Sequence, residues 1–405
     1  MRRKPARHRH SVAHKGLTVL MNAGPWLPVP PHGYGGIENV VATLVPELRR
    51  RGVRVVLCTV QESTLDADRR INTFADGQFA SLAGPYNKVS GIGHAHMQEV
   101  CKALRADPSI DLVHDHMEVV GLSALALLDD DAPPALHTLH WDLCKHADFY
   151  ANFDGHGRVF VNGVSEQQLS RAPLALQAQA VGAVPLATSV PDEMPGGERS
   201  DDFVMLGRVT QDKGQDIAAR ACSKQGRALR MAGPVGPVSG PDELPAALED
   251  DGLRRMADVA YYLESVRPLE DGRSIQWIGA VGGAQKRSLL INAKALLFPI
   301  QWEEPGGTAV IEALAVGTPV IGMRRGVLPD LVDHGVTGFL ADTDEEFTAY
   351  LDRIDEIDRA ACHRAALERF SPAAMADRYL ELYHEVLARV DRHRVRPVQQ
   401  ISNTA

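Results

Sequence analysis

Short runs of consecutive apolar residues alternate with amphipathic segments along the first half of the chain. Apolar strands separated by helices are typical of a parallel sheet that is covered on both faces. The helix signals lie over 37–52, which ends at Gly52, and over "GLSALALL". The strand signals lie at 17–23, 53–59, 111–116, 135–140 and 158–165.

The same alternation restarts after a break that is rich in Pro, Gly and charge, "PDEMPGGERSDD" at 191–202. Such a composition is typical of a linker. The segment at 234–245 is turn-rich and predicts a loop longer than usual. The expected strands are 203–207, 228–233, 274–279, 295–300 and "PVIG", and the expected helices are 214–226, 283–293 and "TAVIEALAVG", closed by Gly317.

These patterns predict an α/β protein with two Rossmann-like domains. A length of 405 residues favours two domains over one. A last helix is expected over 371–390, with Ser371 as its N-cap and Pro372 in its first turn. The predicted units are a disordered basic tail at 1–16, domains at 17–190 and 200–372, a helix at 373–392 that packs on the first domain, and a flexible tail at 393–405.

Composition narrows the class of partner. The net charge of −9 argues against nucleic acid, which needs a basic surface. Five scattered cysteines without a CxxC pair predict reduced thiols and a cytoplasmic protein. The basic start followed by "LTVLMNAGPW" resembles a signal peptide, but about seven apolar residues are short for one. Membrane contact is expected to be at most weak and peripheral, through the basic tail on anionic lipid.

Ligands of such domains bind beyond the carboxyl ends of the strands, so the residues after each predicted strand are the candidates. The first stretch is "PPHGYGGIE" at 30–38, where Gly33, Gly35 and Gly36 allow close backbone approach. The helix that starts near Ile37 offers free N–H groups to an anion or a hydroxyl. The alternative is a plain glycine turn, since the stretch is not a GxGxxG motif.

The second stretch is "HTLHW", in which His140 ends a strand and is expected to face the cleft. "HDH" at 114–116 resembles a metal motif, yet no further ligand at helical spacing accompanies it, so a structural or cleft-lining role is favoured. "DDD" at 129–131 follows a helix and indicates a solvated helix end. We expect no metal site.

The third stretch is "LGRVTQDKG" at 206–214. Arg208 and Lys213 follow the first strand of the second domain, and Gly214 opens the next helix. Two cations beside a helix N-terminus favour a phosphate site over a merely charged surface loop.

The fourth stretch is "EEPGGTAVIEALAVGTP" at 303–319, which carries Glu304 and Glu312 on either side of a glycine loop. The amides of that loop suit a diphosphate, whereas carboxylates suit hydroxyl groups that donate to them. A ligand with sugars on both sides of a phosphate fits both features. The plainer alternative is a capping Glu304 and a surface Glu312.

"EPGGTAVIE" resembles the E-x7-E motif of retaining glycosyltransferases of family 4, which have the GT-B fold. "YGGIE", "TLH", "LGRVTQDKG" and the segment from "EALAVGTPVIG" to "GVTGFL" follow in the order typical of that family, over about residues 17–390.

The resemblance implies a nucleotide-sugar donor, a hydroxyl acceptor and a role for each candidate residue. Arg208 and Lys213 would bind the donor diphosphate, Glu304 the transferred sugar and Glu312 the ribose. The implied contacts also include the amides of Gly306, Gly307 and Thr308 with sugar and phosphates, backbone near Gly279–Val281 with the base, His140 with the donor sugar, and Gly35 and Gly36 with the diphosphate. The family implies no cofactor and no required metal, and a final helix that crosses back to the first domain.

Two residues depart from the family pattern. A bulky apolar residue is common where Gly306 stands, and Leu is frequent where Thr308 stands, so a looser sugar pocket is expected. A hinge is expected near 186–202. The expected activity is transfer of a hexosyl group from a UDP- or GDP-sugar to a small-molecule, natural-product or oligosaccharide acceptor, by a monomer or homodimer. The alternatives are a nucleotide-sugar-binding protein without transferase activity and a GT-B sugar-nucleotide epimerase.

Overall fold

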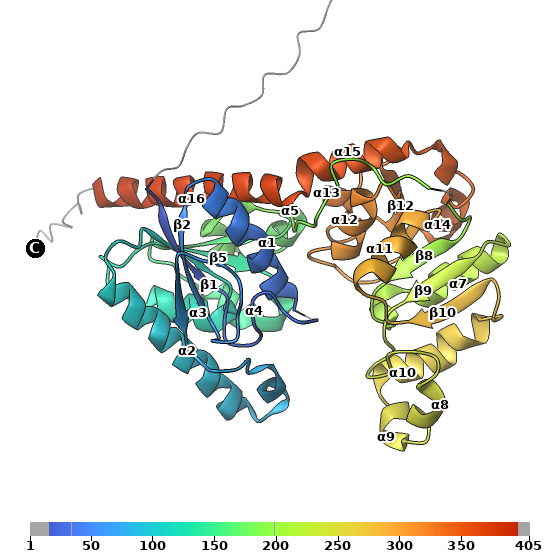
Figure 1. The fold of residues 1–405 in the computed structure, drawn as a ribbon, viewed down its shortest axis with the longest axis horizontal. Helices are drawn as coiled ribbons and strands as arrows, with labels where there is room; N and C mark the ends of the chain where they lie inside the picture. The colour runs from blue at the N-terminus through green and yellow to red at the C-terminus, as the bar shows by residue number, and fades with distance from the viewer. Residues whose placement is uncertain (1–15, 34, 198, 396–405) are drawn as a thin grey trace, which may run out of the picture.

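The computed structural model describes residues 16–33, 35–197 and 199–395 and consists of two lobes, each built on one parallel sheet (Figure 1). The first sheet has seven strands in the order β3-β2-β1-β4-β5-β6-β7 and the second has six in the order β10-β9-β8-β11-β12-β13. Every strand pairing in both sheets is parallel. The two Rossmann-like domains expected from the sequence are therefore confirmed.

The N-terminal domain carries apolar side chains on both faces of its sheet. One core cluster includes Val19 and Leu44, and the other includes Leu20 and Met97. Its strands are β1 (Thr18–Asn22), β2 (Arg54–Thr59), β3 (Arg69–Asn72), β4 (Leu112–Asp115), β5 (Ala135–Leu139), β6 (Val159–Gly163) and β7 (Ala180–Ala183). Its α-helices are α1 (Gly36–Arg50), α2 (Tyr86–Ala106), α3 (Glu118–Ala126), α4 (Ala147–Ala151), α5 (Glu166–Ser170) and α6 (Leu174–Ala178).

The C-terminal domain has one large core cluster, which includes Phe203, Trp277 and Phe339. Its strands are β8 (Phe203–Leu206), β9 (Leu229–Ala232), β10 (Ile275–Gly279), β11 (Leu296–Phe298), β12 (Val320–Met323) and β13 (Gly338–Ala341). Its α-helices are α7 (Gln215–Lys224), α8 (Leu244–Ala247), α9 (Asp251–Arg254), α10 (Ala257–Tyr261), α11 (Gly283–Asn292), α12 (Thr308–Ala315), α13 (Leu328–Leu331), α14 (Asp344–Tyr350) and α15 (Arg359–Arg369). The chain between α10 and β10 contains a π-helical turn at Tyr262–Val266.

Helix α16 (Pro372–Val395) begins beside the second lobe and lies along the first (Figure 1). Its buried residues Tyr379, Leu380 and Tyr383 belong to a core cluster of the N-terminal domain. Arg51 at the end of α1 donates to Asp377 at 2.6 Å. The expected N-cap is present, because the Ser371 hydroxyl accepts from the amide of Ala374 at 3.2 Å.

Several segments differ from the sequence-based expectations. Strands β3 and β7 were missed because both are short edge strands whose residues are only partly buried or exposed. Helix α16 runs to Val395, so the predicted tail at 393–405 begins too early. The rest of that tail and nearly all of the tail at 1–16 lie outside the described residues. In the described part of the chain, no helix is long and apolar enough to cross a membrane.

Candidate active site

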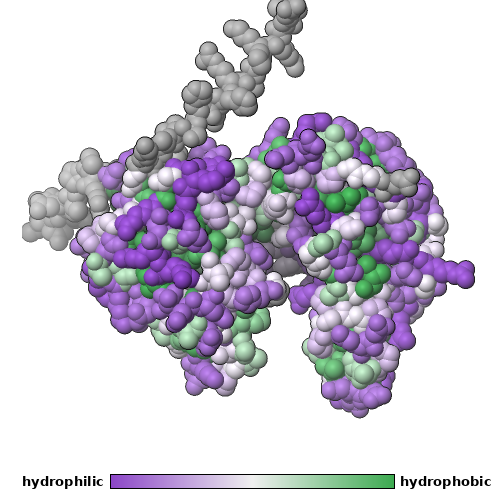
Figure 2. Space-filling model, viewed as in Figure 1, coloured by the Kyte–Doolittle hydropathy of each residue, from purple (hydrophilic) through white to green (hydrophobic). Residues whose placement is uncertain are grey.

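A cleft separates the two lobes on the side away from α16 (Figure 2). Residues of both domains meet in a small pocket within it. The N-terminal domain contributes Asp142, Leu143, Cys144, Gln167, Gln168 and Arg171 to its lining. The C-terminal domain contributes Glu303, Glu304, Pro305 and Gly326. Arg171 lies 3.4 Å from the Glu303 carboxylate, and the amide of Gln167 donates to Asp330 at 3.2 Å. The loop that carries Glu304 therefore faces the N-terminal domain directly.

Lys213 and Glu304 form an ion pair at the carboxyl end of the second sheet. Lys213 follows β8 through a short 3-10 turn, and Glu304 lies in the loop between β11 and α12. The side chains are 21% and 14% exposed, and the Lys213 ammonium also lies 5.5 Å from the rings of Phe298 and Trp302. The structure thus brings together a cation and a carboxylate that are 91 residues apart in the chain.

Arg208 does not share this contact. Its guanidinium lies 4.0 Å from Asp258, and its side chain is 69% exposed. The predicted convergence of Arg208 and Lys213 is therefore met only in part, because Lys213 is held against Glu304 while Arg208 extends into solvent.

The loop before α12 presents backbone donors beside this ion pair. Within the described residues, the amides of Gly306, Gly307 and Thr308 have no protein acceptor. Gly326 packs against this loop. Its φ is +53°, and a Cβ atom there would lie 2.5 Å from the backbone nitrogen of Glu304, so the position has no room for a side chain. The Val327 amide donates to the Glu304 carbonyl at 2.8 Å. Free amides next to Lys213 form an environment suited to an anion.

The looser sugar pocket expected at Gly306 is not found on the side that faces Leu186. A Cβ atom at Gly306 would lie 2.8 Å from Cδ1 of Leu186. Leu186 belongs to the segment between β7 and β8 and packs against the cores of both domains. The space beside Gly306 is therefore filled from the interdomain segment, which neighbouring positions in the sequence cannot reveal.

We expect Gly306→Leu to destabilise the protein by about 1–3 kcal/mol, because the new side chain overlaps Leu186. Leu186→Ala should remove the overlap, so the double variant should be more stable than the sum of the two single changes predicts. Urea unfolding of the four proteins measures this coupling. Additive effects would show that the two positions do not share the space.

Glu312 projects from α12 and pairs with Lys286 of α11 at 2.6 Å. The Glu312 side chain is 19% exposed, so it is neither a free surface acid nor a buried one. Lys286 was not predicted from the sequence, because its partner lies 26 residues away in another helix.

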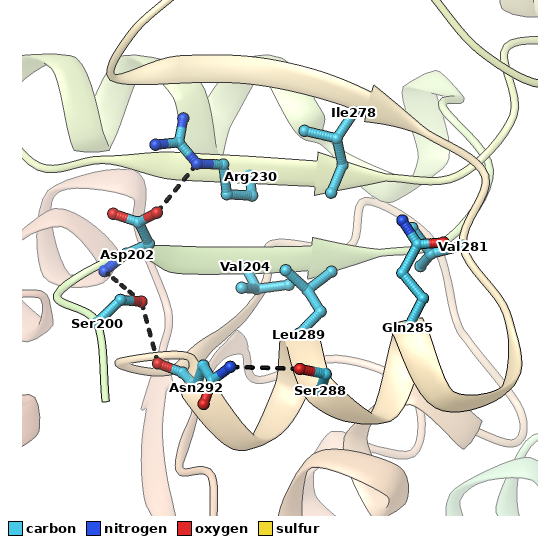
Figure 3. Close-up of a pocket in the computed structure, with 10 residues that line it drawn as sticks. All are labelled: Ser200, Asp202, Val204, Arg230, Ile278, Val281, Gln285, Ser288, Leu289 and Asn292. Atoms are coloured by element: carbon cyan, nitrogen blue, oxygen red, sulfur yellow. Dashed lines mark hydrogen bonds and ion pairs between the residues drawn. The ribbon is translucent and has the colours of Figure 1, made fainter. Parts of the chain in front are cut away.

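In the segment Gly279–Val281, which was predicted to contact the nucleotide base, part of the backbone is hydrogen-bonded within the protein. The Gly279 carbonyl accepts from Gly233 at 2.8 Å, and the Ala280 amide donates to Ser239 at 2.6 Å. The side chain of Val281 lines one end of a cavity of about 350 Å³ between the sheet and α11 (Figure 3). Arg230 and Asp202 line its far end, where Arg230 donates to Asp202 at 3.0 Å. This cavity follows the sheet face and contains neither Lys213 nor Glu304.

His140 follows β5 and hydrogen-bonds through Nε2 with Nδ1 of His116, at 2.8 Å. His114 is buried between Thr138 and Tyr383, at 2.8 and 2.7 Å. Asp115 accepts from His137 at 2.6 Å. The "HDH" motif is thus part of a buried polar network. Within the described residues, no group of three His, Cys, Asp or Glu side chains is arranged to hold a metal ion.

Gly35 precedes α1, and the side chain of Glu38 packs against it. A Cβ atom at Gly35 would lie 2.6 Å from Pro31 and 3.2 Å from the Glu38 carboxylate, whereas Gly36 has open space around it. Glu38 is only 4% exposed. Glu38 belongs to the quoted stretch 30–38 but was not predicted to have a role. The available signal was an acid in the first turn of the predicted helix, close to the apolar residues Val40 and Val41.

Two family models together match most of the chain. "Glycosyltransferase Family 4" matches residues 34–173 and "Glycosyl transferases group 1" matches residues 194–369. The chain is a GT-B glycosyltransferase of family 4. Residues 174–193 lie between the two matches and contain α6, β7 and the first part of the segment that joins β7 to β8.

The glycosyltransferase is similar over nearly its full length to curated relatives. It is 28% identical to the D-inositol 3-phosphate glycosyltransferase of Mycolicibacterium smegmatis, with 91% of this chain and 90% of the relative covered. It is 29% identical to the protein of that name from Saccharomonospora viridis, with 87% and 90% covered.

Solved structures share the fold. AviGT4, a glycosyltransferase involved in avilamycin A biosynthesis, has a TM-score of 0.57 at 24% identity, with 92% of this chain and 98% of that chain covered. Sucrose-phosphate synthase from Thermosynechococcus elongatus has a TM-score of 0.64 at 20% identity, with 92% and 99% covered. HepE from Anabaena, in complex with UDP and glucose, has a TM-score of 0.59 at 15% identity, with 91% and 100% covered.

Glu38 gives the glycosyltransferase a pH-dependent stability. Burial raises the pKa of its carboxyl to about 7, against the lowering effect of a hydrogen bond from its own amide. Between pH about 4.5 and about 7, the unfolded chain loses a proton that the folded protein keeps. The contribution of Glu38 to stability is therefore complete below pH about 4.5 and is lost as the pH rises through about 7.

We expect Glu38→Gln to remove this part of the pH dependence, because the amide does not ionise. Urea unfolding of the wild type and of Glu38→Gln between pH about 4.5 and about 7 measures this difference in pH dependence. The wild type should lose stability relative to the variant as the pH rises, and a constant difference would contradict the assignment.

Proposed function

We propose that the protein is a retaining, metal-independent glycosyltransferase that moves a hexosyl group from a nucleotide sugar to a hydroxyl acceptor. The Lys213–Glu304 pair beside the amides of Gly306, Gly307 and Thr308 carries this proposal. A cation and amides suit the diphosphate, and a carboxylate suits sugar hydroxyls. The complex of HepE with UDP and glucose supports the same class of donor.

Each residue then has one role at the donor. Lys213 and the loop amides stabilise negative charge as the diphosphate leaves, with Arg208 reaching the same group from solvent. Glu304 binds hydroxyls of the transferred sugar, Glu312 binds the ribose, and backbone near Gly279–Val281 contacts the base. His140 contacts the sugar from the N-terminal domain, and Gly35 and Gly36 lie beside the diphosphate.

The proposed reaction breaks the bond between the anomeric carbon and the diphosphate oxygen. A bond from the acceptor oxygen to that carbon forms on the same face, and the acceptor proton passes to the departing diphosphate. The side chains hold the two substrates and stabilise charge, so the proposal assigns no protein nucleophile.

The acceptor is proposed to be a soluble hydroxylated molecule. The curated relatives are named for inositol 3-phosphate, which is a small polyol with one phosphate. On the acceptor side of the cleft, Arg171 lies near Glu303 and Lys145 lies near Glu118, so each of these cations already has an acidic neighbour. We favour a small molecule, natural product or oligosaccharide. Inositol phosphates are the first alternative to test, because an acidic neighbour does not exclude a phosphate site, as Lys213 also has one in Glu304.

Calorimetric titration with UDP, GDP and their hexose conjugates tests the donor assignment. We expect binding of one nucleoside diphosphate and of its sugar conjugate, with no change when EDTA is present. No binding of any of them would contradict the proposal. Binding without turnover across a broad acceptor panel would favour a nucleotide-sugar-binding protein, and sugar isomerisation without an acceptor would favour an epimerase.

A further inference from the structure

The second histidine of the "HDH" motif lies between the core and the cleft. His116 is 2% exposed, and its two ring nitrogens contact different partners. Nδ1 lies 2.8 Å from Nε2 of His140, and Nε2 lies 3.3 Å from the sulfur of Met21. The two imidazole centroids are 5.0 Å apart and the ring planes differ by 30°, which fits an edge-to-edge hydrogen bond.

Both imidazoles are neutral, so only the position of one proton on each ring remains to be decided. Burial lowers the pKa of His140 to about 3 and holds the pKa of His116 well below its usual value. A neutral imidazole has one N–H donor and one acceptor nitrogen. The neighbours of His116 therefore determine the tautomer of both rings.

Met21 decides between the two arrangements. A thioether sulfur only accepts hydrogen bonds, so the nitrogen facing it is satisfied when it carries the proton. Nδ1 of His116 is then the acceptor, and Nε2–H of His140 donates to it. The reverse arrangement would place two acceptors against each other where Met21 is fully buried, which is costly.

His114 does not compete for this hydrogen bond. The Thr138 hydroxyl donates to the side-chain oxygen Oδ1 of Asn162 at 2.9 Å, so His114 Nε2–H must donate to Thr138. Its Nδ1 then accepts from the Tyr383 hydroxyl of α16. Both nitrogens of His114 are used, although its ring centroid lies 4.3 Å from that of His116.

We propose that His116 is a positioning residue that holds His140 as the tautomer protonated on Nε2, so that Nδ1 of His140 accepts a hydrogen bond from a hydroxyl of the donor sugar. Among the described residues, Nδ1 of His140 has no hydrogen-bond partner. The identity of the ligand rests on the proposed function, whereas the tautomer rests on the protein alone.

Long-range proton–nitrogen NMR correlation on protein labelled with ¹⁵N-histidine tests the tautomer. His140→Gln assigns the His140 signals by their loss. We expect Nε2 of His140 to carry the proton, and a proton on Nδ1 would overturn the proposal whether or not the protein transfers sugar. The tautomer is read from the wild-type spectrum, and His140→Gln serves only to assign the signals.

Two variants test the positioning role of His116. His116→Phe removes the acceptor, and we expect His140 to lose its single tautomer and kcat/KM for the donor to fall about tenfold. His116→Asn supplies a carbonyl acceptor near the position of Nδ1 and should restore both. His94→Phe, at an exposed histidine in helix α2, is the matched control. An unchanged tautomer in His116→Phe would show that His116 does not position His140.

Discussion

We expect replacement of Lys213 with methionine to lower sugar transfer by about 10²–10³-fold, because it removes the cation proposed to stabilise the departing diphosphate. Methionine retains a long, flexible, apolar side chain that can keep contact with the rings of Phe298 and Trp302. The loss should fall mainly on kcat if the charge acts as the diphosphate leaves. Steady-state kinetics with the best nucleotide sugar measures it.

The ion pair with Glu304 requires a control for stability. Lys213→Met leaves the Glu304 carboxylate without its partner, and that side chain is only 14% exposed. Circular dichroism should therefore show a folded protein before kinetics are interpreted. Lys224→Met, at an exposed position at the end of α7, should retain full activity. Undiminished turnover of Lys213→Met would remove the residue from the proposed mechanism.

We expect replacement of Asp115 with alanine to destabilise the N-terminal domain by about 3–5 kcal/mol, since three buried donors lose their acceptor. The Asp115 carboxylate is fully buried and accepts from the side chains of Asn22 and His137, each at 2.6 Å, and from the amide of Met117 at 3.3 Å. Asn22, Asp115 and His137 join β1, β4 and β5, so the loss should also disturb the part of the domain that carries His140.

Urea unfolding followed by far-ultraviolet circular dichroism measures the effect of Asp115→Ala. Asp131→Ala is the matched control, because Asp131 is exposed in the "DDD" run after α3. The control should change stability by less than about 0.5 kcal/mol. Equal stability of both variants would show that the Asp115 hydrogen bonds contribute little to the fold.

Much of the fold was predictable because the buried strands carry short runs of apolar residues. Strands β1, β4 and β8 are buried at every position, and each was predicted to within one residue at either end. Edge strand β3 has no such run. The helices between Leu244 and Tyr261 are four or five residues long, too short for a helical period to show.

The candidate site was predictable at the level of residue types and less so at the level of partners. Glycines and charges after predicted strands identified Lys213 and Glu304, because parallel strands end at one edge of a sheet. The partners Lys286 and Leu186 belong to elements distant in the chain, and nothing near them in the sequence marks the contact. The same holds for His116, whose neighbour Met21 lies in β1 and whose neighbour His140 follows β5.

Anomeric analysis of the transfer product tests the central claim most directly. The protein is incubated with the nucleotide sugar that binds in calorimetry and with a panel of hydroxylated acceptors, and the product is examined by proton NMR. We predict a glycoside with the anomeric configuration of the donor, formed together with one nucleoside diphosphate per sugar transferred. A product of inverted configuration would contradict the proposed retaining reaction, and the absence of any glycoside with a bound donor would contradict transfer itself.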